Sequence, residues 1–491
     1  MQESTIHRRR ERLCKITDGL GLGDAYDATI ERIRAQDGDK SRLGIGALLW
    51  VCHAERPLKV DELCYALAVE LGSTDFNSQN VPSVSTLVSC CQGLITVDKE
   101  ASTVRLVHFT LKEYLCAHPD IFGRHHSIMA EICLTYLNSE KVKALSTDPS
   151  PLILGTPFLE YCSLYWGVHA KRDFSNHLRP LTLELLQDYD SHISAISLLA
   201  SVRYLGDWRP GMSFQFSGLH CASFFGIAER VIALIGVEGS DINKGDFWGH
   251  TPLVWAAGRG HEGVVKILLS QAEVNPDKAD NYGITPLMHA AWGGYEGVVK
   301  VLLERSDVNP EKPGGEGKTP LQIAAQRGHE GVVKVLLERG EMNPDKQDDC
   351  GDTALLEATR HGHEKVVKIL LAQAAVSPDK PSHHGSTPLL LAAQYGYENI
   401  VEMLLGREEV NHEKRDSDGD TPLSCAAGYG HEGVIKMLLE KERVNLDNIN
   451  HAGQTPLMRA VGRGNQHVIE RLKLHQATTS VTASGSGDTA R

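Results

Sequence analysis

The sequence lacks the features that mark secreted, membrane-spanning and nucleic-acid-binding proteins. None of its 491 residues belongs to an apolar run of about 18, the length a membrane-spanning helix needs. The N-terminal segment MQESTIHRRRERLCKI has no apolar stretch, so it does not resemble a secretory signal. The net charge is −13, whereas a dedicated nucleic-acid binder needs basic surface to neutralise phosphates. These absences predict a cytoplasmic protein that binds neither membranes nor nucleic acids.

The eleven cysteines show no disulfide or zinc-binding pattern. They are scattered without a CxxC pair, and only Cys90 and Cys91 are adjacent, which is typical of reduced intracellular thiols. Four histidines lie near Cys116 in the sequence, but their spacings match no zinc motif: His108, His118, His125 and His126. We therefore expect no metal and no cofactor.

The most regular feature that is present is a 34-residue repeat. Threonine recurs at this interval seven times: Thr251, Thr285, Thr319, Thr353, Thr387, Thr421 and Thr455. Ser217 stands one step earlier and brings the number of units to eight. A glycine follows each hydroxyl residue nine positions later, and another precedes each threonine by two. A phase kept over this length indicates a repeat architecture.

Each unit has the pattern of two short helices joined by a glycine turn. Thr251 is suited to cap a helix, and Pro252 to occupy its first position. Gly260 supplies the left-handed conformation that ends this helix. A second amphipathic helix is expected over 261–270, and Gly283 permits the reversal into the next unit.

The segments TPLVWAAGRGHEGVVKILL and TPLQIAAQRGHEGVVKVLL closely resemble the ankyrin-repeat signature. The resemblance covers residues 214–476 and implies an α-solenoid of eight helix-turn-helix units. Several positions depart from the pattern: Gly218 and Ala354 replace proline, while Ser223, Thr359 and Val461 replace an alanine.

We attribute the departures in the first and last units to solenoid ends that face water. Arg471 and Lys473 stand where interior units are apolar, and we interpret them as a C-terminal cap. The histidines at 261, 329, 363 and 431 recur in register, which favours a local hydrogen-bonding role. Residues 477–491 are expected to form a disordered tail.

Positions that vary between units predict where a partner binds. They lie at the turn tips and at the end of the first helix, and many are aromatic or arginine, the types that dominate interface energetics. The resemblance implies that a protein partner binds on the concave face. The predicted residues are: Trp248, His250, Arg259, Tyr282, Trp292, Lys318, Arg327, Arg360, His361, His383, Tyr395, Asp418, Asp420, Tyr429 and Arg463. For Trp248, as for Phe214 and Phe216, packing against the upstream region is an equal alternative.

Residues 40–122 have the pattern of a winged-helix module. Helices are expected over 41–53, 60–71 and 83–91, followed by a hairpin formed by LITVD and VRLVH. Residues 1–39 are expected to form a helical segment and residues 123–213 a helical linker domain. The predicted fold class is therefore mainly α: an ankyrin α-solenoid preceded by a winged-helix-like and helical region.

Three N-terminal segments are similar to fungal NACHT-type signalling NTPases of the STAND, or NLR-like, class that end in ankyrin repeats: ALLWVCHAERPLKVDELCYALAVE, LVHFTLKEYL and FLEYCSLYWGVHAK. The similarity covers residues 15–175. That family carries a P-loop domain upstream of this region, and its absence here predicts a truncated relative or an incomplete gene model. The segment 312–319 resembles the end of a P-loop, but lysine replaces the first glycine and Thr319 belongs to the repeat.

These observations favour a non-enzymatic scaffold or ligand-sensing module that binds a protein and no small-molecule substrate. No GxSxG or HExxH motif indicates an enzyme. The alternative is the sensor part of a NACHT-type signalling NTPase with a role like innate immunity or incompatibility. DNA binding by the winged helix is a third hypothesis. It is disfavoured because the expected recognition helix, VSTLVSCCQGL, carries no lysine or arginine.

Overall fold

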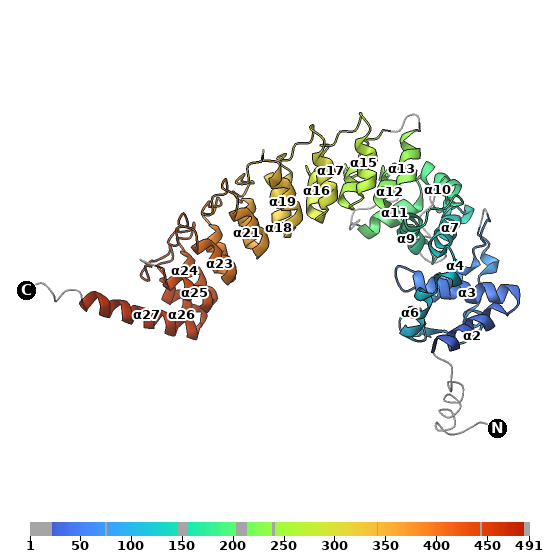
Figure 1. Ribbon diagram of the computed structural model, residues 1–491, viewed down its shortest axis with the longest axis horizontal. Helices are drawn as coiled ribbons and strands as arrows, with labels where there is room; N and C mark the ends of the chain where they lie inside the picture. The colour runs from blue at the N-terminus through green and yellow to red at the C-terminus, as the bar shows by residue number, and fades with distance from the viewer. Residues whose placement is uncertain are drawn as a thin grey trace, which may run out of the picture. The chain divides into compact units, whose positions relative to one another are not determined.

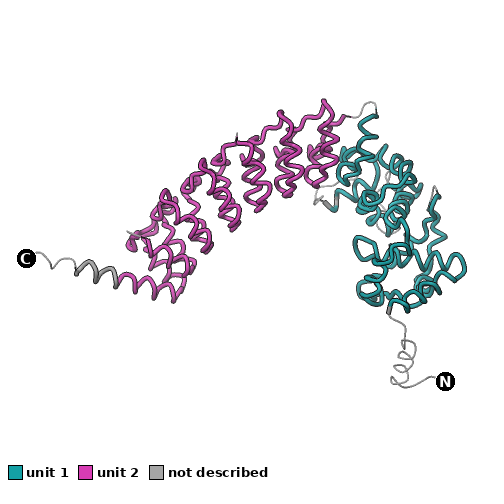
Figure 2. Tube along the Cα trace, in the orientation of Figure 1, with its two compact units in different colours: residues 1–240 teal, residues 241–491 magenta. Residues whose placement is uncertain are grey.

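The computed structural model describes residues 22–73, 76–145, 156–202, 214–237, 241–340, 342–441 and 444–485. The chain divides into two compact units, residues 1–240 and 241–491 (Figure 2). Both are mainly helical, as predicted (Figure 1). The division falls after the first helix pair of the repeat region, so this pair belongs to the N-terminal unit.

After its first helix, the N-terminal unit has the predicted winged-helix arrangement, in which three α-helices precede a hairpin. The antiparallel strands pair Ile95 with Leu106 and Asp98 with Thr103. The elements are: α2 (Leu22–Arg34), α3 (Gly38–His53), α4 (Val60–Ala68), η1 (Ser78–Asn80), α5 (Val84–Cys90), β1 (Ile95–Asp98), β2 (Thr103–Leu106), α6 (Phe109–Ala117) and η2 (Pro119–Ile121). The hairpin was predictable because both strands and their turn are local in sequence.

A helical region follows the winged helix and shares its core. Trp50 of α3 is fully buried, and its ring meets those of Phe158 and Tyr161 edge-on at 5.4 and 5.5 Å. The helices of this region and of the first repeat are: α7 (His125–Leu137), α8 (Glu140–Ala144), α9 (Leu159–Arg172), α10 (Leu178–Gln187), α11 (Ile193–Val202), α12 (Gly218–Phe225) and α13 (Ala228–Ile235).

The first repeat corrects one expectation from the sequence. We expected its departures from the consensus because a solenoid end faces water, but every residue of α12 is buried, and the helix packs on α9 and α10. A Cβ atom at Gly218 would lie 2.1 Å from the carbonyl oxygen of Leu186, so this contact requires glycine. Phe214 and Phe216 are also buried in this unit, which confirms the packing interpretation for both.

The second unit consists of successive helix pairs, each beside the next (Figure 1). Each of the seven threonines accepts a hydrogen bond from the backbone N–H three residues later. The glycine between the two helices of each pair has φ between +70° and +85°, as predicted. The elements are: α14 (Pro252–Gly258), α15 (Glu262–Leu269), α16 (Pro286–Gly293), α17 (Glu296–Leu303), η3 (Gly315–Gly317), α18 (Pro320–Arg327), α19 (Glu330–Glu338), α20 (Ala354–Arg360), α21 (Glu364–Leu371), α22 (Pro388–Tyr395), α23 (Glu398–Leu405), α24 (Pro422–Tyr429), α25 (Glu432–Leu439), α26 (Pro456–Arg463) and α27 (Gln466–Gly485).

Neighbouring repeats are joined by three kinds of recurring hydrogen bond, each of which is accepted by a backbone carbonyl oxygen. The Nε2 atoms of His329, His363 and His431 lie 2.9 Å from a carbonyl oxygen 37 residues earlier. The predicted hydrogen-bonding role is thus confirmed, but the bonds join two repeats and are not local. Five lysines donate from Nζ over 2.6–2.7 Å to a carbonyl oxygen 35 residues earlier: Lys278, Lys312, Lys346, Lys380 and Lys414. At the turn tips, backbone N–H groups donate to the preceding tip, as from Asn281 to Trp248 at 2.9 Å.

The C-terminal end differs from expectation in two respects. Helix α27 continues to Gly485, beyond the expected end of the fold at 476, because extending a helix requires no new nucleation and no proline interrupts it. Residues 486–491 lie outside the described part of the chain. Arg471 pairs with Glu432 at 2.7 Å, but Met458, Val461 and Leu474 are exposed, so this end is less polar than a full cap. In the described segments, we find no helix with the length and apolarity to cross a bilayer.

Four histidines meet in the N-terminal unit, where His169 is buried and His53, His125 and His126 are half-buried. His125 stacks on His53 with ring centroids 4.1 Å apart, and the Nδ1 atoms of His126 and His169 lie 3.0 Å apart. Burial, together with the neighbouring histidines, lowers the pKa of His53 and of His126 to about 4 and that of His169 to about 3. The folded unit therefore holds these three rings neutral at pH 7.

This histidine cluster predicts that acid destabilises the N-terminal unit. An unfolded histidine binds a proton below its usual pKa of about 6.5, whereas the folded side chains bind one only near pH 4. The free energy of unfolding should thus fall as the pH drops from about 6.5 to 4. Urea unfolding followed by fluorescence at pH 7 and pH 5 measures this, and His126→Asn should show a smaller pH dependence. An equal dependence in the variant would contradict the assignment.

The threonine caps predict a second stability effect. The buried Oγ1 of Thr387 accepts the N–H of Leu390 at 3.2 Å, so Thr387→Ala leaves this donor without its partner. We expect a loss of about 1–2 kcal/mol in the free energy of unfolding, measured by urea denaturation. Glu402→Ala, at an exposed position of α23, is the control and should change stability little. An unchanged midpoint for Thr387→Ala would show that the cap is not stabilising.

Candidate partner-binding surface

The turn tips are held in place by aspartate side chains. Asp280 Oδ1 accepts the backbone N–H groups of Tyr282 and Ile284, both at 2.9 Å. Asp246, Asp348 and Asp416 make the same two bonds in their own repeats. The tips are therefore preformed, and Tyr282 is presented with 58% of its surface exposed.

Most of the predicted binding residues are accessible. The exposed ones are: Arg259, Tyr282, Trp292, Arg327, His361, His383, Tyr395, Asp418, Tyr429 and Arg463. Trp248, Lys318 and Arg360 are half-buried. The accessible residues come from the two parts of the repeat where variation was noted, the tip and the end of the first helix.

Two predicted residues are not on the accessible surface. His250 is 2% exposed, and its Nε2 lies 3.2 Å from Asp280 Oδ2 of the next repeat. Asp420 is 8% exposed because it forms an ion pair with Arg459 and accepts the Ser424 hydroxyl at 2.9 Å. Both side chains point inward because polar partners lie inside the stack, a carboxylate for His250 and a guanidinium and a hydroxyl for Asp420. The spacing of the repeat alone does not reveal these partners.

Several exposed side chains at the ends of the first helices contact a neighbouring aromatic or arginine side chain, two of them across repeats and one within its own repeat. Trp292 of α16 is 52% exposed, and the guanidinium carbon of Arg327 lies 4.2 Å from its ring centroid. Arg463 lies 6.0 Å from the ring of Tyr429, and Tyr395 stacks on Tyr397 at 5.8 Å. We name Trp292, Arg327, Tyr395, Tyr429 and Arg463 the aromatic–arginine row. Its members are large, accessible and ordered by a rigid helical frame.

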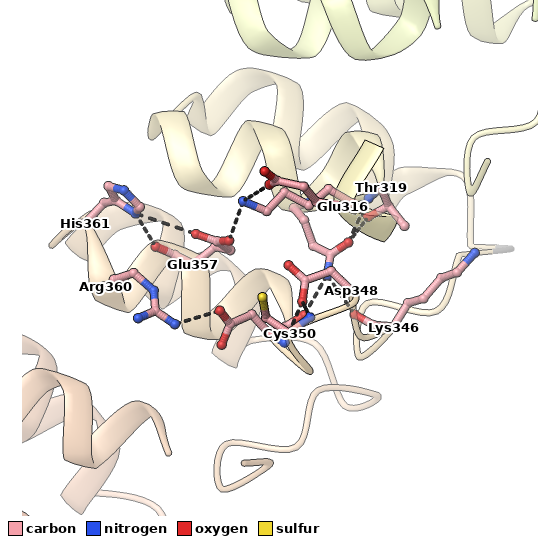
Figure 3. A network of polar contacts seen from close by, with 11 residues as sticks. Glu316, Thr319, Lys346, Asp348, Cys350, Glu357, Arg360 and His361 are labelled. Carbon is pink, nitrogen blue, oxygen red and sulfur yellow. Dashed lines mark hydrogen bonds and ion pairs between the residues drawn. The ribbon is translucent and has the colours of Figure 1, made fainter. Parts of the chain in front are cut away.

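Lys318 and Arg360 face acidic partners inside the stack instead. Lys318 Nζ lies 3.1 Å from the buried carboxylate of Glu357, and Arg360 lies 2.6 Å from Asp352. Figure 3 shows Arg360, Glu357 and His361 in this network. Burial acts to lower the pKa of Lys318, but the attraction of Glu357 outweighs it and raises that pKa. Both cations are already paired with carboxylates of the stack, so they are less available to form ion pairs with a partner.

Among the described residues, three side-chain clusters have the chemistry to hold a metal ion: His250, Asp280 and His289; Asp348, Asp352 and Glu357; and Asp416, Asp420 and Cys425. Sequence analysis missed them because each cluster combines the turn with the first helix. Burial acts to raise the pKa of Asp280, but hydrogen bonds from His250 and His289 outweigh it and hold that pKa well below its usual range. The five lysines that bond to the preceding repeat, from Lys278 to Lys414, were also missed, although their 34-residue spacing in the sequence would have revealed them.

Two family models match separate parts of the chain. A family model described as ankyrin repeats (3 copies) matches residues 219–312, 297–382, 340–416 and 389–483. A second model, the winged helix domain of GPI inositol-deacylase, matches residues 32–133. No curated protein matches the chain.

Among solved structures, the ankyrin repeat domain of Bcl-3, described as a unique member of the IkappaB protein family, aligns at 24% identity with a TM-score of 0.41. The alignment covers 46% of this chain and 99% of that domain. The ankyrin family model covers more than half of this chain, and such repeats suggest interaction with other proteins. The chain therefore belongs to the ankyrin-repeat family and carries a winged-helix domain ahead of its repeats.

Proposed function

We propose that this chain is a non-enzymatic interaction protein that binds a protein partner across the aromatic–arginine row. The observation that carries the proposal is the pair of Trp292 and Arg327, in which a half-exposed indole lies under a guanidinium at 4.2 Å. Tryptophan and arginine are enriched among the residues that dominate binding energy. A large indole left accessible on an ordered surface supports a role in recognition.

The frame around the row favours binding with little loss of entropy. Trp292 lies in the last turn of α16, and its carbonyl oxygen accepts the His329 Nε2–H from the next repeat at 2.9 Å. The cation–π contact with Arg327, worth about 0.5–1 kcal/mol at an exposed site, further restricts both side chains. A surface ordered before binding pays less of the association cost than a flexible one.

Truncating the indole tests the proposal. A partner is first identified as a protein retained by the wild-type chain, and its Kd is then measured by calorimetry for Trp292→Ala and Arg327→Ala. Each variant should lose about 2 kcal/mol of binding free energy, or about 30-fold in Kd, because a hot-spot side chain is removed. Circular dichroism should remain unchanged, since both side chains lie on the surface.

Lys300→Ala provides the matched control. Lys300 is an exposed residue of α17, the second helix of the repeat that carries Trp292, and its ammonium pairs with Glu296 at 2.6 Å. It should bind the partner with wild-type affinity. Wild-type affinity of Trp292→Ala as well would place the binding surface elsewhere.

A second candidate is the sensing part of a NACHT-type signalling NTPase. It is supported by the order of elements, because a winged helix and a helical region precede the ankyrin repeats as in the family that the N-terminal segments resemble. An in-frame P-loop motif after a strand in the upstream genomic sequence would support this candidate. Its absence would leave the interaction protein as the single proposal.

A further inference from the structure

Two histidines and an aspartate converge between the repeats that contain Thr251 and Thr285, each repeat being counted from its turn tip. His250 precedes the first of these threonines, Asp280 stands at the following turn, and His289 lies on α16. Asp280 Oδ2 is 3.2 Å from His250 Nε2 and 3.0 Å from His289 Nε2. One nitrogen or oxygen from each of the three residues lies within 4.8 Å of the others.

The surrounding groups orient these side chains. Asp280 Oδ1 is occupied by two backbone N–H groups, so Oδ2 is the oxygen that faces the imidazoles. Behind His250, the Oδ2 atom of Asp246 lies 3.6 Å from Nδ1 and accepts the Trp255 indole N–H at 3.0 Å. A histidine that binds a metal through one nitrogen usually donates its other N–H to a carboxylate or carbonyl group. Asp246 lies on that side of His250, but at 3.6 Å it is beyond hydrogen-bond distance of Nδ1.

The carboxylates at equivalent positions in other repeats are neutralised by lysine or arginine side chains. The carboxylates of the second cluster meet Lys318 and Arg360, and those of the third meet Arg459. At the first cluster, the groups that meet the Asp280 carboxylate are two imidazoles and backbone N–H groups. Imidazole, unlike ammonium or guanidinium, offers a lone pair to a metal ion.

We propose that His250 Nε2, Asp280 Oδ2 and His289 Nε2 form a binding site for a divalent transition-metal ion of the Zn²⁺ class. Zinc takes nitrogen and carboxylate ligands at about 2.0–2.2 Å, which in a tetrahedron places neighbouring ligand atoms about 3.3 Å apart. The two distances from Asp280 Oδ2, 3.2 and 3.0 Å, are close to this value.

The exposure of the three ligands favours a site with an open position. His250 and Asp280 are buried, with 2% and 1% of their side chains exposed, whereas His289 is 23% exposed. The ion therefore enters past His289, where water provides the fourth ligand. Because His250 belongs to one repeat and the other two ligands to the next, the bound ion joins the two repeats.

Metal titration of the full chain tests the site. After treatment with a chelator and dialysis, ZnCl2 is titrated into the wild type, His289→Gln and His384→Gln, with calorimetry and thermal unfolding as readouts. His289→Gln removes one ligand at the accessible edge, and His384→Gln removes an exposed histidine outside the three clusters. Wild type and His384→Gln should bind one more Zn²⁺ per chain than His289→Gln, and Zn²⁺ should raise their unfolding midpoint.

CoCl2 provides a measurement that needs no variant. Co²⁺ bound to the wild type should show the visible absorption of a four-coordinate ion without thiolate charge-transfer bands, because the ligands are nitrogen and oxygen. Equal Zn²⁺ stoichiometry in all three chains would assign binding to other histidines or thiols and overturn the proposal. Absence of binding to the wild type, or a thiolate-type Co²⁺ spectrum, would overturn it as well.

Discussion

Hydrogen bonding between adjacent repeats is the interaction on which the second unit depends. Three kinds of donor bond to backbone carbonyl oxygens of the preceding repeat. They are the recurring histidines such as His329, the recurring lysines such as Lys312, and the backbone N–H groups of the turn tips. Each repeat thus stabilises its immediate neighbours, as in other solenoids. Such a frame fixes the positions of exposed residues without involving their side chains in the bonds between repeats. The side chains of Trp292 and Arg327 are therefore available for recognition.

Local features were predictable because the residues that cause them are close in sequence. The threonine caps, the left-handed glycines and the β1–β2 hairpin each depend on segments of a few residues. The exposed members of the predicted surface, such as Tyr395 and Tyr429, followed from the same register. These two side chains are exposed, whereas the equivalent residue of the first repeat, Phe225, is buried.

Features that depend on distant segments were not predictable. His250 was expected at the surface, but it is buried because Asp280, 30 residues later, supplies a partner. The burial of α12 depends on α9 and α10, and the cluster of His53 with His169 joins positions more than 100 residues apart. The same reasoning explains why the candidate metal ligands became visible only in three dimensions.

The pairing of Lys318 with Glu357 has a consequence for how the array can change in evolution. The hydrogen bonds to backbone carbonyl oxygens could form in almost any order of repeats, since every repeat offers the same carbonyl groups. Deleting the unit from 353 to 386, however, would set Lys318 beside Leu391, which occupies the place of Glu357 in the following unit. Its ammonium would then face an apolar neighbour, so recombination between units is restricted by their charges even where their frames are interchangeable.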